Sequence, residues 1–410
     1  MKKIVFFALF LAAASGPLAG DWPQWRGPHR DGVSRETGLL QAWPSAGPRR
    51  LWLSRDIGIG YSAPALAKGR LFVLGTKDGE EQLFAKEAKS GRTLWTAALG
   101  EILSNNWGDG PRGAATVDGD RVYALGAEGG LVCADVLDGT VRWRVDLVED
   151  LGGKAPTWGY TESVLVDGDR MICTPGGRRG TLAALDKKTG EVLWRSGDWT
   201  DGAQYASVMP AEFNGQRQLI QLTQKTLAGV SARDGSILWR NAWPGRTAVI
   251  PTPIVLGDGI YISSGYGVGC RKITIGAGHE VTEDYSNKYI KNQHGGVLLY
   301  DGHLYGYSDG RGWTCQNLQS GKVVWDSKKL GKGCVVYADN RLYCLTESSG
   351  TVALAAAGTG GWKEHGRFNL EPQTELRKPS GRVWTHPVVA NGVLYLRDQE
   401  LLFAFDVRAR

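Results

Sequence analysis

The sequence predicts an all-β fold, an eight-bladed β-propeller whose blades are four-stranded antiparallel sheets. The first observation is a Gly-x-x-x-Trp phrase that occurs five times and ends at Trp95, Trp143, Trp194, Trp239 and Trp325. Recurrence at a period of roughly 40 to 50 residues is the signature of a repeat architecture. The second is that short segments separated by turns fill the chain between these phrases, with no long amphipathic helical pattern. The third is that a strand missing from the last repeat has a candidate near the N-terminus.

The repeat that ends near Trp143 illustrates the four expected strands. The first two, over residues 115–117 and 121–125, flank an Asp-Gly-Asp turn. The third and fourth, over residues 131–135 and 141–145, flank an Asp-Gly turn. Glycine at such turns supplies the positive φ that tight hairpins require. Alternation of polar and apolar residues in the second strand is typical of a half-buried strand.

The same pattern predicts eight repeats. Their second strands start near Leu71, Val122, Met171, Gln218, Ile260, Leu304, Leu342 and Leu394. The last repeat breaks off after its third strand, residues 402–407, so its outer strand is missing. Residues 49–54 are a candidate for that strand, because Trp52 stands at the Trp position of the phrase. Pairing these two segments closes the ring and protects an otherwise open sheet edge.

Tryptophans of the fourth strand are expected to dock each blade against the next. A large flat side chain fills the widening gap between neighbouring sheets of a propeller. These docking residues are Trp52, Trp95, Trp143, Trp194, Trp239 and Trp325. Blade five carries Tyr285 at this position, and blade seven has Trp362 without the glycine phrase. The tryptophans therefore say little about ligand binding.

The N-terminus predicts export. Lys2 and Lys3 precede an apolar run over residues 4–14, followed by small residues, which is typical of a signal peptide over residues 1–20. Asp21 stands where a lipoprotein would carry Cys, so we expect a periplasmic or secreted protein without a membrane span after cleavage. An uncleaved anchor is the alternative. A segment rich in Trp, Arg and Pro (residues 21–46) then leads into the propeller (residues 47–410).

Charge and cysteine content exclude some classes of protein. The formal net charge of +6 falls to +4 without Lys2 and Lys3, and basic residues alternate with acidic ones, so nucleic acid is not an expected partner. Four of the six cysteines occupy equivalent blade positions and are expected as buried thiols: Cys133, Cys173, Cys315 and Cys344. The pattern leaves the redox state of Cys270 and Cys334 open. We expect a monomer.

Function in a propeller concentrates where loops enter the innermost strands around the channel. The repeat register places these residues in that ring: Tyr61, Arg112, Thr161, Tyr205 to Ser207, Ile250, His294, Lys332 and Trp384. Neighbouring positions add Ser62, Glu162, Ser163, Thr252, Cys334 and His386. The ring is polar and aromatic, and it differs from blade to blade.

Besides a non-catalytic site for a ligand or a peptide, two interpretations of this ring remain open. In an active one, His294 or His386 is the general base, with Glu162 as its partner or as a cation ligand. Arg112 and Lys332 would orient an anionic ligand. The candidate cofactor-binding residues are Tyr61, Arg112, Trp158, Glu162, Asn292, His294, Lys332, Trp384 and His386. In the other interpretation, these polar residues satisfy strand-end backbone groups and bridging waters.

The Gly-x-x-x-Trp repeats resemble those of pyrroloquinoline-quinone (PQQ) type propellers, and the resemblance covers nearly all of the chain beyond residue 20. In length and blade count the chain is similar to BamB-like stand-alone propellers. Residues 21–32, Asp-Trp-Pro-Gln-Trp-Arg-Gly-Pro-His-Arg-Asp-Gly, resemble the start of secreted PQQ-like proteins of planctomycetes. This resemblance implies a non-catalytic scaffold that binds an envelope protein or a small ligand at the channel face.

The same resemblance also implies an alternative, a quinoprotein oxidoreductase that uses PQQ and Ca²⁺ to oxidise an alcohol or a sugar. Glu162 would then be the candidate metal ligand. The chain departs from these dehydrogenases in three ways: it has no adjacent cysteine pair, no long insertions above the channel and no haem-attachment motif. These departures favour the scaffold.

Overall fold

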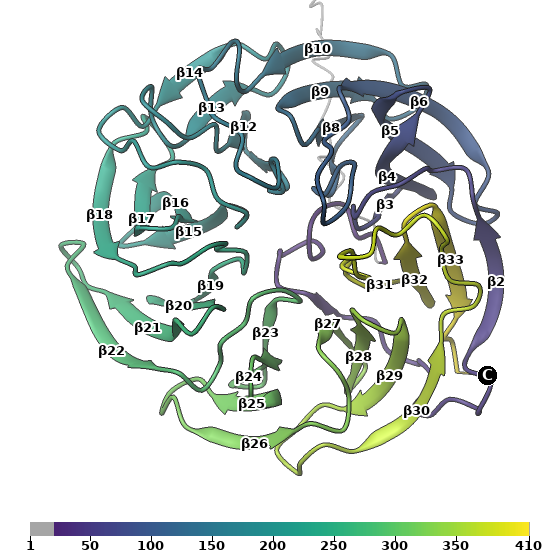
Figure 1. Cartoon of the computed structure of the whole chain (residues 1–410). Coiled ribbons are helices and arrows are strands. Elements are labelled where there is room, and N and C mark those ends of the chain that lie inside the picture. The colour runs from purple at the N-terminus through teal and green to yellow at the C-terminus, as the bar shows by residue number, and fades with distance from the viewer. Residues whose placement is uncertain (1–19, 410) are drawn as a thin grey trace, which may run out of the picture.

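The computed structural model describes residues 20–409, so the expected signal peptide lies outside the described residues apart from Gly20. Eight sheets form a ring around a central channel, and the described residues contain no helix (Figure 1). The predicted eight-bladed, all-β propeller is therefore confirmed. Within the described part of the chain, no helix is long and apolar enough to cross a membrane.

Each blade is a four-stranded antiparallel sheet, and in blades one to seven these four strands run outward from the channel in sequence order. Blade one comprises β3 (Ala65–Ala67), β4 (Arg70–Lys77), β5 (Glu80–Glu87) and β6 (Thr93–Gly100). Blade two comprises β7 (Thr116–Asp118), β8 (Arg121–Leu125), β9 (Gly130–Asp135) and β10 (Val141–Asp146). Blade three comprises β11 (Leu165–Asp167), β12 (Arg170–Cys173), β13 (Ala183–Asp186) and β14 (Val192–Arg195). Blade four comprises β15 (Met209–Phe213), β16 (Gln216–Leu222), β17 (Thr226–Ser231) and β18 (Ile237–Ala242).

The second half of the ring follows the same plan. Blade five comprises β19 (Ile254–Leu256), β20 (Gly259–Ser264), β21 (Gly269–Ile275) and β22 (Val281–Asn287). Blade six comprises β23 (Val297–Tyr300), β24 (His303–Ser308), β25 (Gly312–Asn317) and β26 (Val323–Ser327). Blade seven comprises β27 (Gly333–Ala338), β28 (Arg341–Thr346), β29 (Thr351–Ala356) and β30 (Glu364–Asn369), with β1 (Val33–Ser34) added beside β27. Blade eight comprises β31 (Val388–Ala390), β32 (Val393–Asp398), β33 (Leu401–Asp406) and β2 (Arg49–Ser54).

The N-terminal strand closes the ring as predicted. β2 pairs antiparallel with β33, with Trp52 opposite Ala404 and Ser54 opposite Leu402. Arg49 at the start of β2 forms an ion pair with Asp406 at 2.9 Å. Blade eight thus contains both ends of the propeller, and its outer edge is occupied by a strand from the other end of the chain.

Glycine and tryptophan of the repeated phrase meet across blade boundaries. A Cβ atom on Gly139 would lie 2.5 Å from the Trp95 ring of the preceding blade, and the Trp95 indole donates to the Val136 carbonyl at 3.2 Å. Gly91, Gly190 and Gly235 are equally close to Trp52, Trp143 and Trp194. The glycine therefore serves both the turn and the close approach of the indole.

The docking position varies where the phrase varies. In blade five the Tyr285 hydroxyl donates to the Leu318 carbonyl at 2.9 Å, which replaces the indole contact. Trp239 instead donates to the Gln218 side chain of its own blade, while its ring packs in a cluster that includes Ile273 of blade five. All six cysteines are buried free thiols, including Cys270 and Cys334, whose state the sequence left open.

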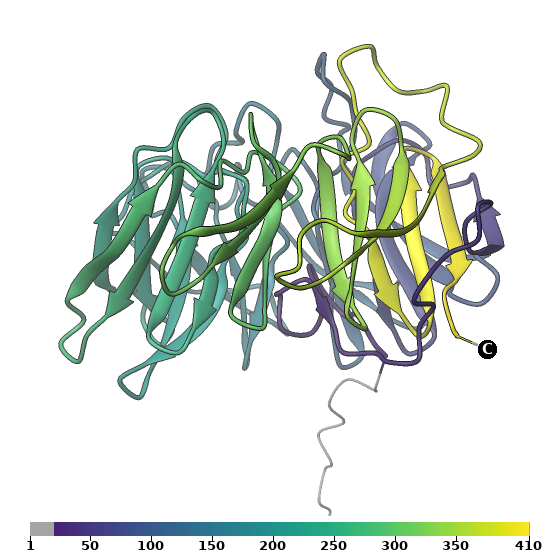
Figure 2. The same cartoon turned by 90° about the horizontal axis from the view of Figure 1, so that it is seen from below.

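A hub segment, residues 22–36, crosses one end of the channel (Figures 1 and 2). Trp22 exchanges two backbone hydrogen bonds of 2.8 Å with Leu66 of blade one, and the Pro23 carbonyl accepts from Val117 of blade two. Further along, β1 pairs in parallel with β27 of blade seven. The segment thus joins blades that do not touch one another in the ring.

Buried arginines extend the hub to other blades. Arg30, which is 2% exposed, donates to the Ser163 carbonyl of blade three at 2.6 Å. Arg26 donates to the Val297 carbonyl of blade six at 2.6 Å, and the Trp25 indole donates to Thr252 beside blade five at 3.0 Å. Since a buried charge is costly unless it is well hydrogen-bonded, these contacts fix the segment in one position.

Replacement of Gly139 by alanine tests the docking contact. Both Gly139 (φ 77°) and Gly119 (φ 60°) have left-handed backbone conformations, but a Cβ on Gly119 meets nothing within 4 Å. Gly119→Ala should therefore cost only the strain of the conformation, about 1–2 kcal/mol. Gly139→Ala should cost about 1–3 kcal/mol more, because Trp95 must move. Urea unfolding measures both, and equal losses would refute the docking role.

Removal of the N-terminal segments tests the hub and the closure separately. Deletion of residues 21–46 removes the hub segment and retains β2, whereas deletion of residues 21–55 removes both. Loss of buried Trp22 alone should cost about 3 kcal/mol or more. We expect the melting temperature to fall with the first deletion and further with the second. A protein without residues 21–55 that melts like the full chain would contradict this account.

Candidate functional site

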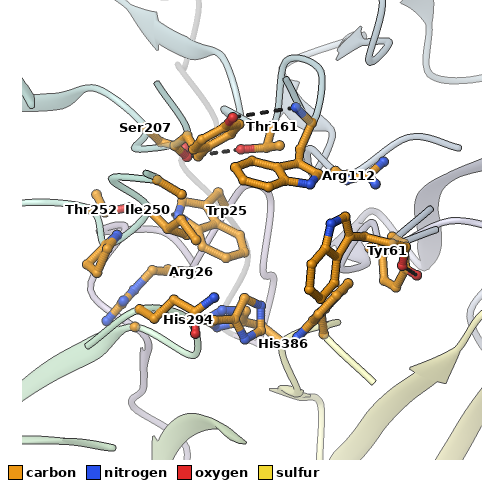
Figure 3. Close-up of a pocket in the computed structure, with 18 of the residues that line it drawn as sticks. Trp25, Arg26, Tyr61, Arg112, Thr161, Ser207, Ile250, Thr252, His294 and His386 are labelled. Atoms are coloured by element: carbon orange, nitrogen blue, oxygen red, sulfur yellow. Dashed lines mark hydrogen bonds between the residues drawn. The ribbon is translucent and has the colours of Figure 1, made fainter. Parts of the chain in front are cut away.

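A cavity of about 190 Å³ lies in the channel, between the hub segment and the loops that lead into the innermost strands (Figure 3). Trp25 and Arg26 line the cavity on the side of the hub segment. Its other lining residues are Tyr61, Trp107, Arg112, Trp158, Thr161, Tyr205, Ser207, Ala248, Ile250, Pro251, Thr252, Tyr266, Gln293, His294, Gly296, Trp384 and His386. Every blade except blade seven, or the loop that enters it, contributes to this lining.

Aromatic rings form most of the cavity wall. The Tyr61 ring lies 5.4 Å from that of Trp384, and Trp107 lies 6.5 Å from the same indole. On the facing side, Trp158 and Tyr205 have ring centroids 5.7 Å apart. Tilted rings at these separations make favourable contacts with one another and leave their faces available to a planar or apolar group.

Two arginines give the cavity a positive charge. Arg112 lies over the Tyr61 ring at 5.2 Å and donates to the carbonyls of Gly108 and Gly110 at 2.7 and 2.6 Å. Arg26 donates to the carbonyls of Asp31 and Val297. Burial lowers the pKa of Arg26 to about 10 and also lowers the pKa of Arg112, and a guanidinium with a pKa of about 10 remains charged at neutral pH.

Six of the nine candidate ligand-binding residues line the cavity: Tyr61, Arg112, Trp158, His294, Trp384 and His386. Asn292 does not, because its amide is buried and donates to the Tyr307 carbonyl at 2.9 Å. Lys332 does not either, since it forms an ion pair with Asp309 at 2.9 Å. The ring positions Thr161, Ser207 and Ile250, identified from the repeat register, also lie in the lining.

Glu162 is also absent from the cavity wall. Its carboxylate is 2% exposed and accepts hydrogen bonds from the backbone N–H and the hydroxyl of Thr174, the latter at 2.7 Å. Burial raises the pKa of Glu162 to about 7, and the nearby Arg30 guanidinium opposes that shift. The adjacent Thr161 faces the cavity, so alternation along the extended backbone turns Glu162 away from it.

His294 and His386 lie side by side at one wall, with ring centroids 5.5 Å apart in an edge-on arrangement. Burial lowers the pKa of His294 to about 3 and the pKa of His386 well below its ordinary value. Both imidazoles are therefore neutral at pH 7. A base with so low a pKa transfers protons poorly near neutrality, which makes these histidines weak candidates for general-base catalysis.

The donor set of the cavity does not fit Ca²⁺. Calcium takes 6 to 8 oxygen ligands, with carboxylates prominent among them. Among the described residues, no Asp or Glu lines the cavity. Nearby carboxylates have other partners: Glu347 accepts from the Trp384 indole at 3.0 Å, Asp309 holds Lys332, and Glu162 accepts from Thr174. A quinone held through a calcium ion would find two guanidinium groups in place of acidic ligands.

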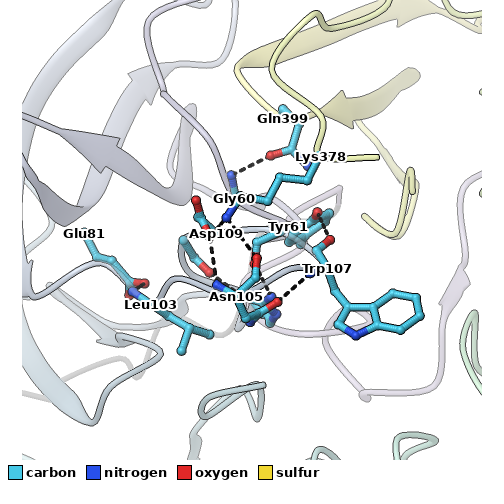
Figure 4. Close-up of polar contacts among 12 residues, drawn as sticks. Gly60, Tyr61, Glu81, Leu103, Asn105, Trp107, Asp109, Lys378 and Gln399 are labelled. Atoms are coloured by element: carbon cyan, nitrogen blue, oxygen red, sulfur yellow. Dashed lines mark hydrogen bonds and ion pairs between the residues drawn. The ribbon is translucent and has the colours of Figure 1, made fainter. Parts of the chain in front are cut away.

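Two loops form a raised rim beside the cavity (Figures 2 and 4). Residues 101–115 connect blade one to blade two, and residues 370–387 connect blade seven to blade eight. Lys378 joins them through an ion pair with Asp109 at 2.7 Å and a hydrogen bond to the Asn105 carbonyl at 2.9 Å. The Tyr61 hydroxyl donates to the Trp107 carbonyl at 3.1 Å, so the rim is tied to the cavity wall.

Several lining residues were missed by the sequence analysis. Trp25 and Arg26 were treated as part of a leader of unassigned position, although the dense Trp and Arg content of residues 21–32 was a signal of buried contacts. Trp107 lies in a loop outside the repeat register. Tyr266 lies in the β20–β21 turn, which is also outside the ring positions that the repeat register identifies.

Comparisons with known proteins agree with this architecture. The family model described as outer membrane protein assembly factor BamB matches residues 80–327, more than half of the chain. The outer membrane protein assembly factor BamB of Yersinia pestis is 22% identical over 382 residues, which is 86% of this chain and 77% of that protein. Its namesake from Bordetella pertussis is 27% identical over 174 residues, only 42% of this chain and 39% of that protein.

Solved structures show the same ring. BamB from Moraxella catarrhalis superposes with a TM-score of 0.62 at 15% identity, over 88% of this chain and 99% of that one. The quinohemoprotein alcohol dehydrogenase from Comamonas testosteroni reaches a TM-score of 0.65 at 11% identity, over 98% of this chain and 82% of that one. These likenesses establish the fold alone. By its family match, the chain belongs to the PQQ-like propeller family of outer membrane protein assembly factor BamB.

Proposed function

We propose that this protein is a non-catalytic binding propeller of the cell envelope, whose channel-face cavity receives an acidic or planar group of a protein partner. The observation that carries the proposal is the cavity lining, which combines aromatic faces with two charged guanidinium groups and no carboxylate among its described residues. Aromatic and arginine side chains dominate the binding energy of protein interfaces. An anionic group would be attracted by Arg112 and Arg26 and sandwiched by the rings.

The size and setting of the cavity support a partner protein over a free cofactor. Its volume of about 190 Å³ is below the roughly 300 Å³ at which ordinary ligand pockets begin. A side chain or chain terminus fits such a space. Beside it, the rim exposes Trp107 (47%) and Leu376 (56%), two large apolar side chains available for contact outside the cavity.

The chemistry of the wall supports binding without catalysis. Its two histidines are neutral and half-buried, and Glu162, the carboxylate considered as their partner, accepts from Thr174 elsewhere. The names of the sequence relatives, outer membrane protein assembly factors, describe proteins of the envelope that act on other proteins. The signal-peptide pattern of residues 1–20 supports the same compartment for this chain.

Site-specific photo-crosslinking tests the proposal. A photoreactive phenylalanine analogue at Trp107 should yield a discrete adduct with an envelope protein in intact cells, because this residue lies on the rim and lines the cavity. The same analogue at Leu137, which is 68% exposed in an outer turn, is the control. Adding Arg112→Gln to the Trp107 probe should weaken the adduct several-fold. Equal adducts at both positions, or none at position 107, would contradict the proposal.

Calorimetric titration with PQQ separates this function from the alternative. Because the wall offers no acidic ligands among its described residues, Ca²⁺ should not promote PQQ binding. Saturable micromolar or tighter binding that requires Ca²⁺ and is lost in His294→Ala would overturn the proposal. The protein would then be treated as a quinoprotein-type oxidoreductase acting on an alcohol or a sugar.

A buried carboxylate anchors the rim. Glu81 is fully buried, and its two oxygens accept from the backbone of Leu103 at 3.2 Å and of Ala127 at 2.7 Å (Figure 4 shows the first contact). Burial raises the pKa of Glu81 to about 7, against the effect of both hydrogen bonds and of Arg112. The loop that carries Trp107 therefore starts from a group that titrates near neutrality.

This shift predicts a pH-dependent stability. Between pH 4.5 and about 7 folded Glu81 retains a proton that the unfolded chain has lost, so the unfolding free energy should fall as pH rises through this window. The fall amounts to about 1.4 kcal/mol per unit of pKa difference. In Glu81→Gln the fall in unfolding free energy should be smaller, because the contribution of Glu81 is lost. The contribution of Glu162, whose pKa is also raised, should remain. Urea unfolding from pH 4.5 to 7.5 measures this fall, and the exposed Glu149→Gln, as control, should match the wild type.

A further inference from the structure

Three potential metal ligands from successive blades converge at the wall of the cavity. His294 precedes β23 of blade six, Cys334 lies in β27 of blade seven, and His386 precedes β31 of blade eight. One ligating atom from each lies within 4.8 Å of the other two. Cys334 is fully buried, whereas both imidazoles line the cavity. The cluster therefore has a closed side, formed by the thiol, and a side that faces the cavity.

The spacing of the sulfur and one nitrogen matches a metal site. A metal bonded to sulfur at about 2.3 Å and to imidazole nitrogen at about 2.0–2.1 Å, with a tetrahedral angle between them, separates these two atoms by about 3.5–3.6 Å. Cys334 Sγ and His294 Nδ1 are 3.6 Å apart. The third ligand, His386, needs only a small rotation or shift to complete the set, since its ligating nitrogen is within 4.8 Å of both.

Neighbouring groups hold the three side chains in place, as they commonly do around metal ligands. The Cys334 thiol donates to the backbone carbonyl of Trp384 at 3.7 Å, and His294 interacts with the same backbone carbonyl. Metal-ligating side chains are usually oriented by such hydrogen bonds to groups outside the ligand set. On the other side, the Trp25 ring packs edge-on against His386 at 4.7 Å. Both imidazoles are thus held in place by neighbours on the described chain.

The charge around the cluster selects the metal. Arg26 lies beside it, since a Cβ on Gly296 would lie 2.5 Å from its guanidinium and 3.3 Å from the His386 ring. Lys332 is a second positive charge near His294, and Glu347 is a negative charge near Cys334, so two of the three charges around the cluster are positive. A divalent ion with one thiolate and two neutral imidazoles carries a net charge of +1, which the buried guanidinium opposes. A cuprous ion with the same ligands is neutral. Thiolate is also the soft ligand type that favours Cu(I).

We propose that His294, Cys334 and His386 bind one cuprous ion, with the remaining coordination position facing the cavity. Binding forms two Cu–N bonds and one Cu–S bond and releases the thiol proton of Cys334 to solvent, without a change in oxidation state. The site is independent of the proposed partner binding, because it requires only these three side chains. An occupant of the cavity that carries a thioether, thiolate or imidazole has access to the open position.

Competition with a chromophoric Cu(I) chelator tests the proposal. The full protein, reduced and handled without oxygen, is titrated with Cu(I) in the presence of bicinchoninate. We expect one equivalent of Cu(I) per chain to be withheld from the chelator. Cys334→Ala and His386→Gln should each reduce that retention at least tenfold. A wild-type protein that withholds no Cu(I), or a Cys334→Ala variant that withholds as much as the wild type, would overturn the site.

A matched variant controls for loss of structure. Cys344 is a fully buried thiol in the adjacent strand β28 of the same blade, where it pairs with Val335, and it lies outside the three-residue cluster. Cys344→Ala should therefore retain one equivalent of Cu(I). Copper X-ray absorption on the wild type should show one sulfur and two imidazole nitrogens. Retention of Zn²⁺ in place of Cu(I), or a spectrum without sulfur, would refute the cuprous site.

Discussion

The structure depends on the burial of the hub segment in the channel. Each blade of a propeller contacts only its two neighbours in the ring. The contacts between blades therefore do not by themselves fix the distance across the channel. The hub contacts blades on different sides of the circle: Arg30 donates to blade three, Arg26 donates to blade six, and the Pro23 carbonyl accepts from blade two, which is opposite blade six. Since each guanidinium is buried, its donors must remain with these carbonyls. The hub therefore limits how far opposite blades can move apart.

The same segment forms the floor of the site in the channel. Trp25 and Arg26 line the cavity from the hub side, while Trp107 and Trp384 line it from the rim side. The floor is thus part of the element that stabilises the ring, and the walls come from loops that vary from blade to blade. A change in the hub segment acts on both fold and site, whereas a change in a rim loop alters the site with little effect on the ring.

Periodicity made the fold and much of the site predictable, and its limits explain the rest. Repeat register located the eight second strands, the closing strand with Trp52, and ring positions such as His294 and Trp384. It assigned Glu162 to the ring as well, but one residue of offset turns a side chain to the opposite side of an extended backbone. Trp25 lies outside any repeat, and only the folded ring reveals which blades it reaches.

The buried positive charge of the cavity governs which occupants it admits. Arg26 and Arg112 donate to backbone carbonyls, which accept hydrogen bonds from the guanidinium groups but do not neutralise their charge. Such a field attracts an acidic group and repels a divalent cation. Binding of a quinone through Ca²⁺, as in the dehydrogenases, is therefore unfavourable in this cavity. A cuprous ion held by a thiolate adds no net charge to this field. An acidic partner and a neutral copper centre are thus two occupants that the same charge permits.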